Sequence, residues 1–176
     1  KHGRVKNGPD VITYTSLIAA CGRGRKWQRA MHLLESMQAR GLTPNLRTYT
    51  VLIDAFAKGG QWQFALSCLD EMEAGRSIPN VIHYSSVLDA CARKGKWQEA
   101  LSLLERMQRK GVEPDVVALH SAAHACANAG KWREAQHIVF NRLPAVEQKE
   151  DSYNGEKQPV KDTARWRYHI LLLAAA

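Results

Sequence analysis

The chain has 176 residues, which suits one domain or several short repeats, and 45% of them are hydrophobic, enough for a continuous core. Lysine and arginine outnumber aspartate and glutamate by 25 to 17, and the net charge of +8 favours a polyanionic partner, with nucleic acid first. No apolar run reaches the length of a membrane span, and none of the 4 cysteines has the short spacing of a zinc site, so the sequence predicts neither a membrane segment nor a metal centre.

Three residue types recur along the chain at a fixed step of 35 positions. The tryptophans are Trp27, Trp62, Trp97 and Trp132, the methionines are Met37, Met72 and Met107, and the prolines are Pro9, Pro44, Pro79 and Pro114. A fixed period in this range predicts stacked structural units rather than a fold with one central core.

The period divides the chain into successive segments. In chain order they are the tail of a preceding repeat at 1–10, complete repeats at 11–45, 46–80 and 81–115, a degenerate fourth repeat at 116–143, an insertion or linker at 144–164, and the truncated first helix of a fifth repeat at 165–176. The insertion is inferred from its polar composition and from Pro144, which falls where a helix should still be running.

Each complete repeat reads as two helices. In the first repeat, Tyr14, Leu17 and Ile18 fall on one face at helical spacing, and residues 22–25 break this pattern as a turn. A second apolar stripe starts near Trp27, so a second helix follows. Neither helix can bury its face within one repeat, and we expect the tryptophans to wedge between stacked neighbours.

Several short motifs return at equivalent places. They are Val-Ile-Thr-Tyr at 11–14, Leu-Arg-Thr-Tyr at 46–49, Val-Ile-His-Tyr at 81–84, Lys-Gly-Lys-Trp-Gln-Glu-Ala-Leu at 94–101 and Arg-Lys-Gly-Val-Glu-Pro-Asp at 109–115. With these motifs the chain resembles the pentatricopeptide repeat family, in its class of pure 35-residue repeats. The tetratricopeptide repeat competes less well, because its period is 34 residues. The resemblance implies an all-α fold, a right-handed α-solenoid of stacked antiparallel helix pairs.

In the family that this chain resembles, single-stranded RNA runs along the first helices, and two residues of each repeat read one base. The resemblance assigns base recognition to Thr15 with Asn45, Thr50 with Asn80, Ser85 with Asp115, and His120, whose partner is hidden by the insertion. A carboxylate only accepts hydrogen bonds and suits guanine or uracil, whereas an amide also donates and suits adenine or cytosine. Short hydroxyls leave room for a purine. The resemblance implies adenine, adenine and guanine for the three complete pairs, which gives a core of 5'-A-A-G-3'. The same residue types also cap helices.

The resemblance further places base-sandwiching side chains in one repeat position. These are Ile12, Arg47, Ile82 and Val117. Phosphate contacts are expected from Arg23, Lys58 and Arg93, because each lies three helical turns past the sandwich position on the same face. Cations also suit helix C-termini, so a structural role is compatible with the same pattern.

These features predict a sequence-selective binder of single-stranded RNA that serves RNA processing, stability or translation in a mitochondrion or plastid, as the resemblance implies. The alternative is an architectural subunit of an organellar ribonucleoprotein, such as a mitochondrial or plastid ribosome, that contacts rRNA and proteins. No nucleophile elbow, phosphate loop, metal-ligand cluster or convergent acid pair is visible, so we expect no enzyme activity, no cofactor, no small-molecule substrate and no membrane partner.

Overall fold

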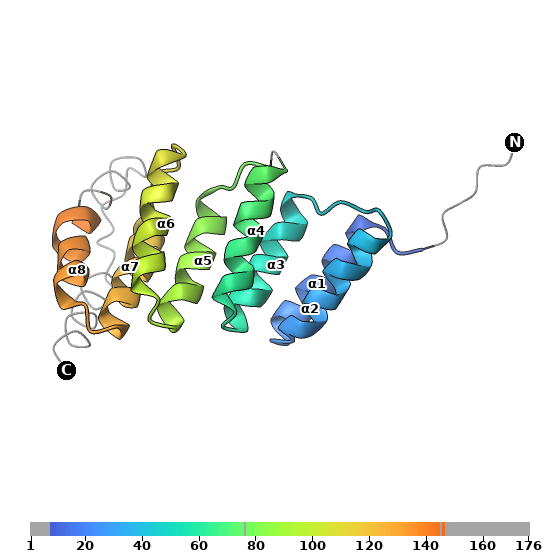
Figure 1. The fold of residues 1–176 in the computed structure, drawn as a ribbon, viewed down its shortest axis with the longest axis horizontal. Helices are drawn as coiled ribbons and strands as arrows, with labels where there is room; N and C mark the ends of the chain where they lie inside the picture. Colours follow the sequence, from blue (N-terminus) through green and yellow to red (C-terminus); the bar gives the residue numbers. More distant parts are fainter. Residues whose placement is uncertain (1–7, 76, 145, 147–176) are drawn as a thin grey trace, which may run out of the picture. The chain divides into compact units, whose positions relative to one another are not determined.

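The structure is a computed structural model and describes residues 8–75, 77–144 and 146. Helices alternate with short turns through these residues, and no β-strand occurs among them (Figure 1). The helices are α1 Val11–Arg23, α2 Trp27–Ala39, α3 Leu46–Lys58, α4 Trp62–Ala74, α5 Val81–Arg93, α6 Trp97–Arg109, α7 Val116–Asn128, α8 Trp132–His137 and the π-helical η1 Ile138–Arg142. None of these described helices combines the length and the apolar character that crossing a membrane requires.

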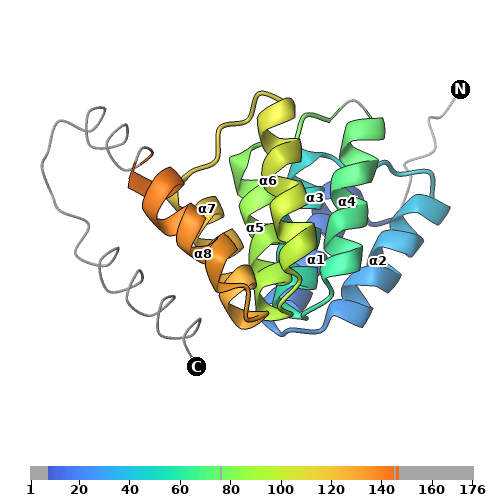
Figure 2. The same cartoon turned by 60° about the vertical axis from the view of Figure 1, so that its left-hand side comes forward.

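The chain divides into two compact units, Lys1–Ile78 and Pro79–Ala176. In the first unit α1 packs against α2 and α3, and α3 packs against α4; in the second, α5 packs against α6 and α7, and α7 packs against α8 and η1. Figure 2 shows α2 and α4 of the first unit in front of α1 and α3. The first helices of neighbouring repeats therefore lie side by side within each unit, and this confirms the all-α fold of stacked helix pairs.

Small residues bring the first helices of neighbouring repeats close together. A Cβ atom added to Gly22 would lie 3.2 Å from the Cβ of Ala55, so α1 and α3 approach closely at this point. Gly22 is buried and helical, and α1 continues to Arg23. The turn predicted to begin at Gly22 is therefore wrong by two residues: this glycine serves a close helix contact rather than a chain reversal.

Trp27 packs against the following repeat. Its ring stacks on Phe64 of α4 at a centroid distance of 5.8 Å, and a Cβ atom added to Gly59 would come within 2.6 Å of it. The backbone at Gly59 thus rests on the indole, which confirms for Trp27 the predicted place between repeats. Trp132, in the same repeat position on α8, is 50% exposed.

The predicted apolar face of α1 is only partly buried. Tyr14 and Ile18 lie in the core, but Leu17 is 45% exposed, whereas Leu52, one repeat later, is fully buried. Among the described residues α3 has α1 beside it, and α1 has no helix on the corresponding side. The same sequence position is therefore core or surface according to its neighbour.

The cysteines are core residues rather than reactive groups. Cys68, Cys91 and Cys126 are buried and unpaired with any other cysteine. Burial raises the pKa of Cys68 and of Cys91 to about 12 and that of Cys126 to about 11. These thiols stay protonated at neutral pH and behave as small apolar side chains.

The fourth repeat departs from the others in its second helix. After α8 the backbone widens into η1, and helical conformation continues through Leu143, Pro144 and Val146. Leu143 is buried, and the helix continues past Pro144, where the insertion was predicted to start. A proline has no N–H to donate, so a locally widened turn accommodates it without breaking the helix.

Some predicted segments lie outside the described residues. They are residues 1–7 of the preceding tail, residues 147–164 of the insertion, and the first helix of the fifth repeat at 165–176.

The Trp27 contact yields a paired prediction about stability. Gly59→Ala places a methyl group against the indole and should lower the free energy of unfolding by about 1–3 kcal/mol. Gly24 holds the same position one repeat earlier, but a Cβ there meets its nearest atom at 3.6 Å. Gly24→Ala should therefore stabilise the chain by about 0.4–1 kcal/mol. Urea denaturation of both variants tests the contact, and equal effects would contradict it.

Candidate nucleic-acid interface

The residue that closes each repeat caps the first helix of the next. Asp10, Asn45, Asn80 and Asp115 all have extended backbone conformations and precede a first helix. The Oδ1 atom of Asn45 accepts the backbone N–H of Thr48 at 2.9 Å, and Oδ1 of Asp115 accepts that of Ala118 at 2.7 Å. The structural role that the sequence allowed for these residues is therefore present at every repeat boundary described.

Capping fixes the direction of the remaining side-chain atom. In Asn45 and Asn80 the Oδ1 atom is committed to backbone N–H groups, so the second polar atom is Nδ2, a donor. In Asp115 the second atom is Oδ2, an acceptor. Asn45 and Asn80 are exposed and Asp115 is half-buried. Two repeats therefore present a donor and one presents an acceptor at the same place.

One predicted recognition pair makes direct contact in the structure. Ser85 Oγ of α5 donates to Oδ1 of Asp115 at 3.3 Å, although 30 residues separate them. Ser85 is only 8% exposed, so its hydroxyl meets the closing carboxylate rather than open solvent.

A second predicted pair is joined through an intermediate residue. Thr15 Oγ1 lies 2.8 Å from Thr48 Oγ1, and Thr48 Oγ1 donates to Asn45 Oδ1 at 3.0 Å. Thr15 is 6% exposed and also bonds to the Val11 carbonyl at 2.7 Å. Thr48 was missed in the sequence analysis, and its signal is the N3 position of a capping box, three residues after the cap.

Thr50 and His120, which were also predicted to recognise bases, are both half-buried. Thr50 belongs to the first unit and Asn80 to the second, so this pair stays a prediction. His120 stacks on His124 of the same helix, with ring centroids 6.1 Å apart.

The predicted sandwich residues lie at the surface. Ile12 is 74% exposed, and Ile82, Val117 and Arg47 are exposed as well. An exposed aliphatic side chain that recurs in one repeat position provides an apolar surface for a planar group. Their role against bases stays a prediction.

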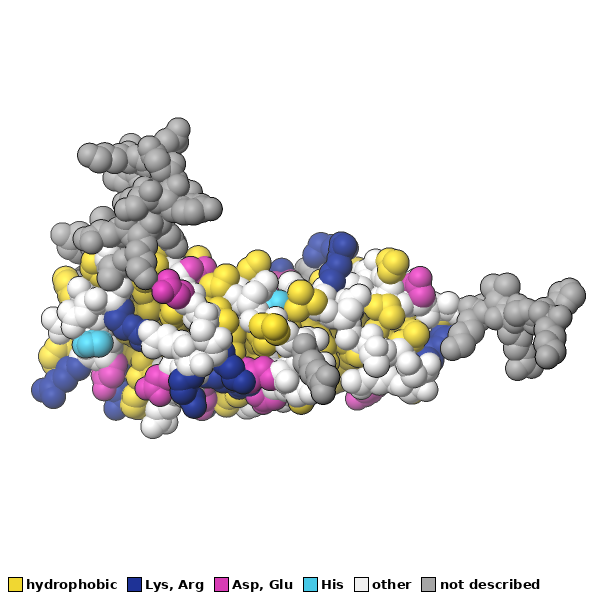
Figure 3. Space-filling view, turned by 90° about the horizontal axis from the view of Figure 1, so that it is seen from above, with side chains coloured by type: hydrophobic (Ala, Val, Ile, Leu, Met, Phe, Trp, Pro, Cys, Tyr) yellow, Lys and Arg dark blue, Asp and Glu magenta, His cyan; other side chains and the backbone are white. Residues whose placement is uncertain are grey.

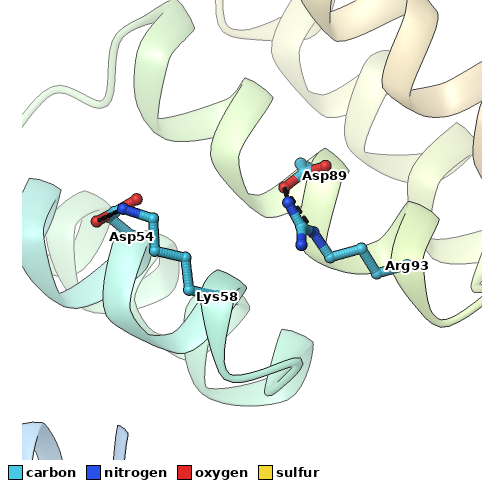
Figure 4. A network of polar contacts seen from close by, with 4 residues as sticks. All are labelled: Asp54, Lys58, Asp89 and Arg93. Atoms are coloured by element: carbon cyan, nitrogen blue, oxygen red, sulfur yellow. Dashed lines mark hydrogen bonds and ion pairs between the residues drawn. The ribbon is translucent and has the colours of Figure 1, made fainter. Parts of the chain in front are cut away.

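Two of the three predicted phosphate contacts are engaged in ion pairs. Lys58 Nζ lies 2.7 Å from Asp54 Oδ2, and Arg93 Nη2 lies 2.9 Å from Asp89 Oδ2 (Figure 4). Both pairs join residues four apart on one helix and are half-exposed, so each contributes about 0–1 kcal/mol and a phosphate can compete for the cation. Arg23 has Ala19 in place of the aspartate.

The position of these cations holds a different group in the fourth repeat. Asn128 Nδ2 donates to the carbonyl oxygen of Ala92 at 2.8 Å and so ties α7 to α5. Within the described residues, no three His, Cys, Asp or Glu side chains gather as metal ligands.

The cap at Asn45 gives a stability prediction. Asn45→Ala removes the acceptor of Thr48 and should lower the free energy of unfolding by about 1 kcal/mol. Asn45→Asp keeps an oxygen at the cap and should leave stability nearly unchanged. Chemical denaturation of both variants is the measurement, and an alanine variant as stable as the parent would argue against the bond.

Comparisons with known proteins agree with this architecture. A family model described as "PPR repeat family" matches residues 9–58 and 79–128, and one described as "PPR repeat" matches residues 47–75. A search of curated protein sequences finds no match.

Solved structures of similar fold are found as well. The pentatricopeptide repeat protein PPR10 from maize is 29% identical with a TM-score of 0.65, over 94% of this chain and 22% of PPR10. PPR10 in complex with an 18-nt psaJ RNA element gives 22% identity and a TM-score of 0.69, over 94% and 23% of the two chains. The PPR domain of Arabidopsis thaliana protein-only RNase P 1, in complex with tRNA, gives 16% identity and a TM-score of 0.71, over 95% and 83%. The chain thus spans less than a quarter of the length of PPR10.

Proposed function

Because the chain belongs to the pentatricopeptide repeat family, we propose that it binds single-stranded RNA and that each repeat reads one nucleotide. The observation that carries the proposal is the contact between Ser85 and Asp115, which joins the first helix of a repeat to that repeat's closing residue. The RNA-bound states of PPR10 and of the RNase P domain support the same partner class.

The closing residue supplies the base contact in this proposal. The exposed Nδ2 of Asn45 or Asn80 donates to the ring nitrogen of adenine, and Oδ2 of Asp115 accepts the imino N–H of guanine. The buried hydroxyls of Thr15 and Ser85 do not contact the base in this proposal but orient the closing side chains. Ser85 orients Asp115 directly, and Thr15 orients Asn45 through Thr48. Their small size leaves space for a purine, and the read sequence is 5'-A-A-G-3'.

Apolar and charged side chains complete the proposed interface. Ile12, Ile82 and Val117 stack against bases from the side, and Arg47 does the same with its planar guanidinium group. Arg23, Lys58 and Arg93 meet phosphates, for which Lys58 and Arg93 exchange their aspartate partners. We place this activity in a mitochondrion or plastid, where the protein acts by occupying RNA rather than by catalysis.

A second candidate is an architectural role in an organellar ribonucleoprotein. It is favoured by the exposed aromatic side chains of Trp132 and Phe140, which lie on one side of α8 and η1 among polar residues. Co-sedimentation of the native protein with ribosomal subunits would select this role over binding of individual transcripts.

The first prediction from the proposal concerns RNA affinity. A single strand that contains 5'-A-A-G-3' should bind more tightly than a scrambled strand of the same composition. The logarithm of affinity should fall with the logarithm of salt concentration by about 0.7 for each phosphate neutralised. Filter binding across a salt series measures both quantities, and equal affinity for the two strands would refute base reading.

A reciprocal exchange at the closing position tests the chemistry of reading. Asp115→Asn should move the preference of the third position from guanine to adenine, and Asn45→Asp should move the first from adenine to guanine. Each exchange should change the ratio of the affinities for the adenine-containing and guanine-containing RNAs by about tenfold, which corresponds to about 1.4 kcal/mol. Both variants keep a capping oxygen, so melting curves should match the parent. Variants that retain the parent's preference would contradict the assignment.

A further inference from the structure

The turn between α1 and α2, blue in Figure 1, concentrates positive charge. Its cations are Arg23, Arg25, Lys26 and Arg29, which we call the basic turn. No acidic residue occurs between Val11 and Leu34. All four side chains are exposed, and none forms an ion pair with a carboxylate in the described part of the chain.

Arg25 occupies a backbone conformation that favours glycine. Its φ angle is 53°, in the left-handed region, and it is the only non-glycine residue with positive φ among those described. The other repeats place Gly60, Gly95 and Gly130 in this position. A side chain with a Cβ atom is disfavoured there, so the arginine is retained against a local cost in free energy.

Lys26 and Arg29 oppose the dipole of α2. Lys26 is the N-cap of this helix without a side-chain capping bond, and the first turn contains no acidic residue. A helix N-terminus carries partial positive charge and is stabilised by acids. The third and fourth repeats also have a lysine N-cap, Lys96 and Lys131, but they place an acid, Glu99 and Glu134, at the position of Arg29.

Folding stability therefore does not account for the basic turn. Left-handed strain, the opposed dipole and repulsion among like charges all act against it, and only Arg23 sits at a helix C-terminus where a cation is favourable. By contrast, the view from above in Figure 3 shows basic and acidic side chains interspersed. A concentration of unpaired cations that is unfavourable for the fold indicates an anionic ligand.

We propose that the basic turn binds phosphates of RNA that flanks the nucleotides read by the first helices. This inference rests on the proposed function. Thr15, the reading position of this repeat, lies eight helical residues, or about 12 Å, before Arg23. The other three cations follow Arg23 along the chain, in the turn and in the first turn of α2. The phosphodiester backbone of RNA fits them, because the guanidinium group of arginine and the ammonium group of lysine bind phosphate without regard to base identity.

The test compares two RNAs on the full 176-residue chain. A short RNA holds little more than 5'-A-A-G-3', and a long RNA extends the same core on both sides. The variants are Arg25→Gly, the residue type of the three other repeats, and Arg29→Glu, the residue type of the third and fourth repeats. Arg40→Gln is the matched control, because it removes an exposed cation at the opposite end of α2.

The parent should bind the long RNA more tightly than the short one. Each basic-turn variant should lose about fivefold or more in affinity for the long RNA, with a shallower salt dependence, and should bind the short RNA as the parent does. Thermal melting should rise by about 2–4 °C, because the strain or the opposed dipole is relieved. The Arg40→Gln control should keep the parent's preference for the long RNA.

Three outcomes would overturn the inference. If the variants still bind the long RNA more tightly than the short one to the same degree as the parent, the turn does not bind flanking RNA, while the proposed function stands. Equal losses on both RNAs place the turn within the reading site instead. Binding of the parent to anionic lipid vesicles but to neither RNA removes the proposed function together with this inference.

Discussion

Contact between the first helices of neighbouring repeats is the constraint on which the rest of the structure depends. No repeat can bury its own apolar faces, so α1 packs on α3 in the first unit and α5 on α7 in the second. Small buried residues make this packing close: Gly22 meets Ala55, and the cysteines at 91 and 126 are fully buried. This contact sets the distance between equivalent side chains of the two adjacent repeats within each unit.

The same contact couples stability to the proposed reading of bases. A closing residue such as Asn45 uses one side-chain atom to cap the next first helix, and the cap leaves its other atom with a fixed direction. Hydroxyls from the preceding first helix reach the same residue, directly at Asp115 and through Thr48 at Asn45. Preorganisation of this kind lowers the entropic cost of binding, because the contacting groups are already ordered.

The repeat period predicts a large part of this fold. It predicts the helix pairs and the place of Trp27 between repeats, since both depend on spacing along one chain. Features that depend on which neighbour is present were not predictable in this way. Leu17 is exposed where Leu52 is buried, and Gly22 lies inside α1 against Ala55 instead of opening the turn.

The candidate site divides along the same line. The polar residues after each tyrosine and each proline could be predicted from local motifs. The hydrogen bond of Thr48 with Thr15 and the ion pair of Lys58 with Asp54 could not, because they depend on three-dimensional neighbours and on side-chain rotamers. The left-handed conformation of Arg25 was also not evident, because its sequence position looks like an ordinary surface arginine until it is aligned with Gly60, Gly95 and Gly130.

The central claim is that the free side-chain atoms of the closing residues face the RNA. Nuclear magnetic resonance of the side-chain amides observes these atoms directly, through the Nδ2 groups of Asn45 and Asn80. Addition of RNA containing 5'-A-A-G-3' should shift both amide signals, while the amide of Asn128, which is bound to the Ala92 carbonyl, should change little. Unchanged Asn45 and Asn80 signals under saturating RNA would contradict the account.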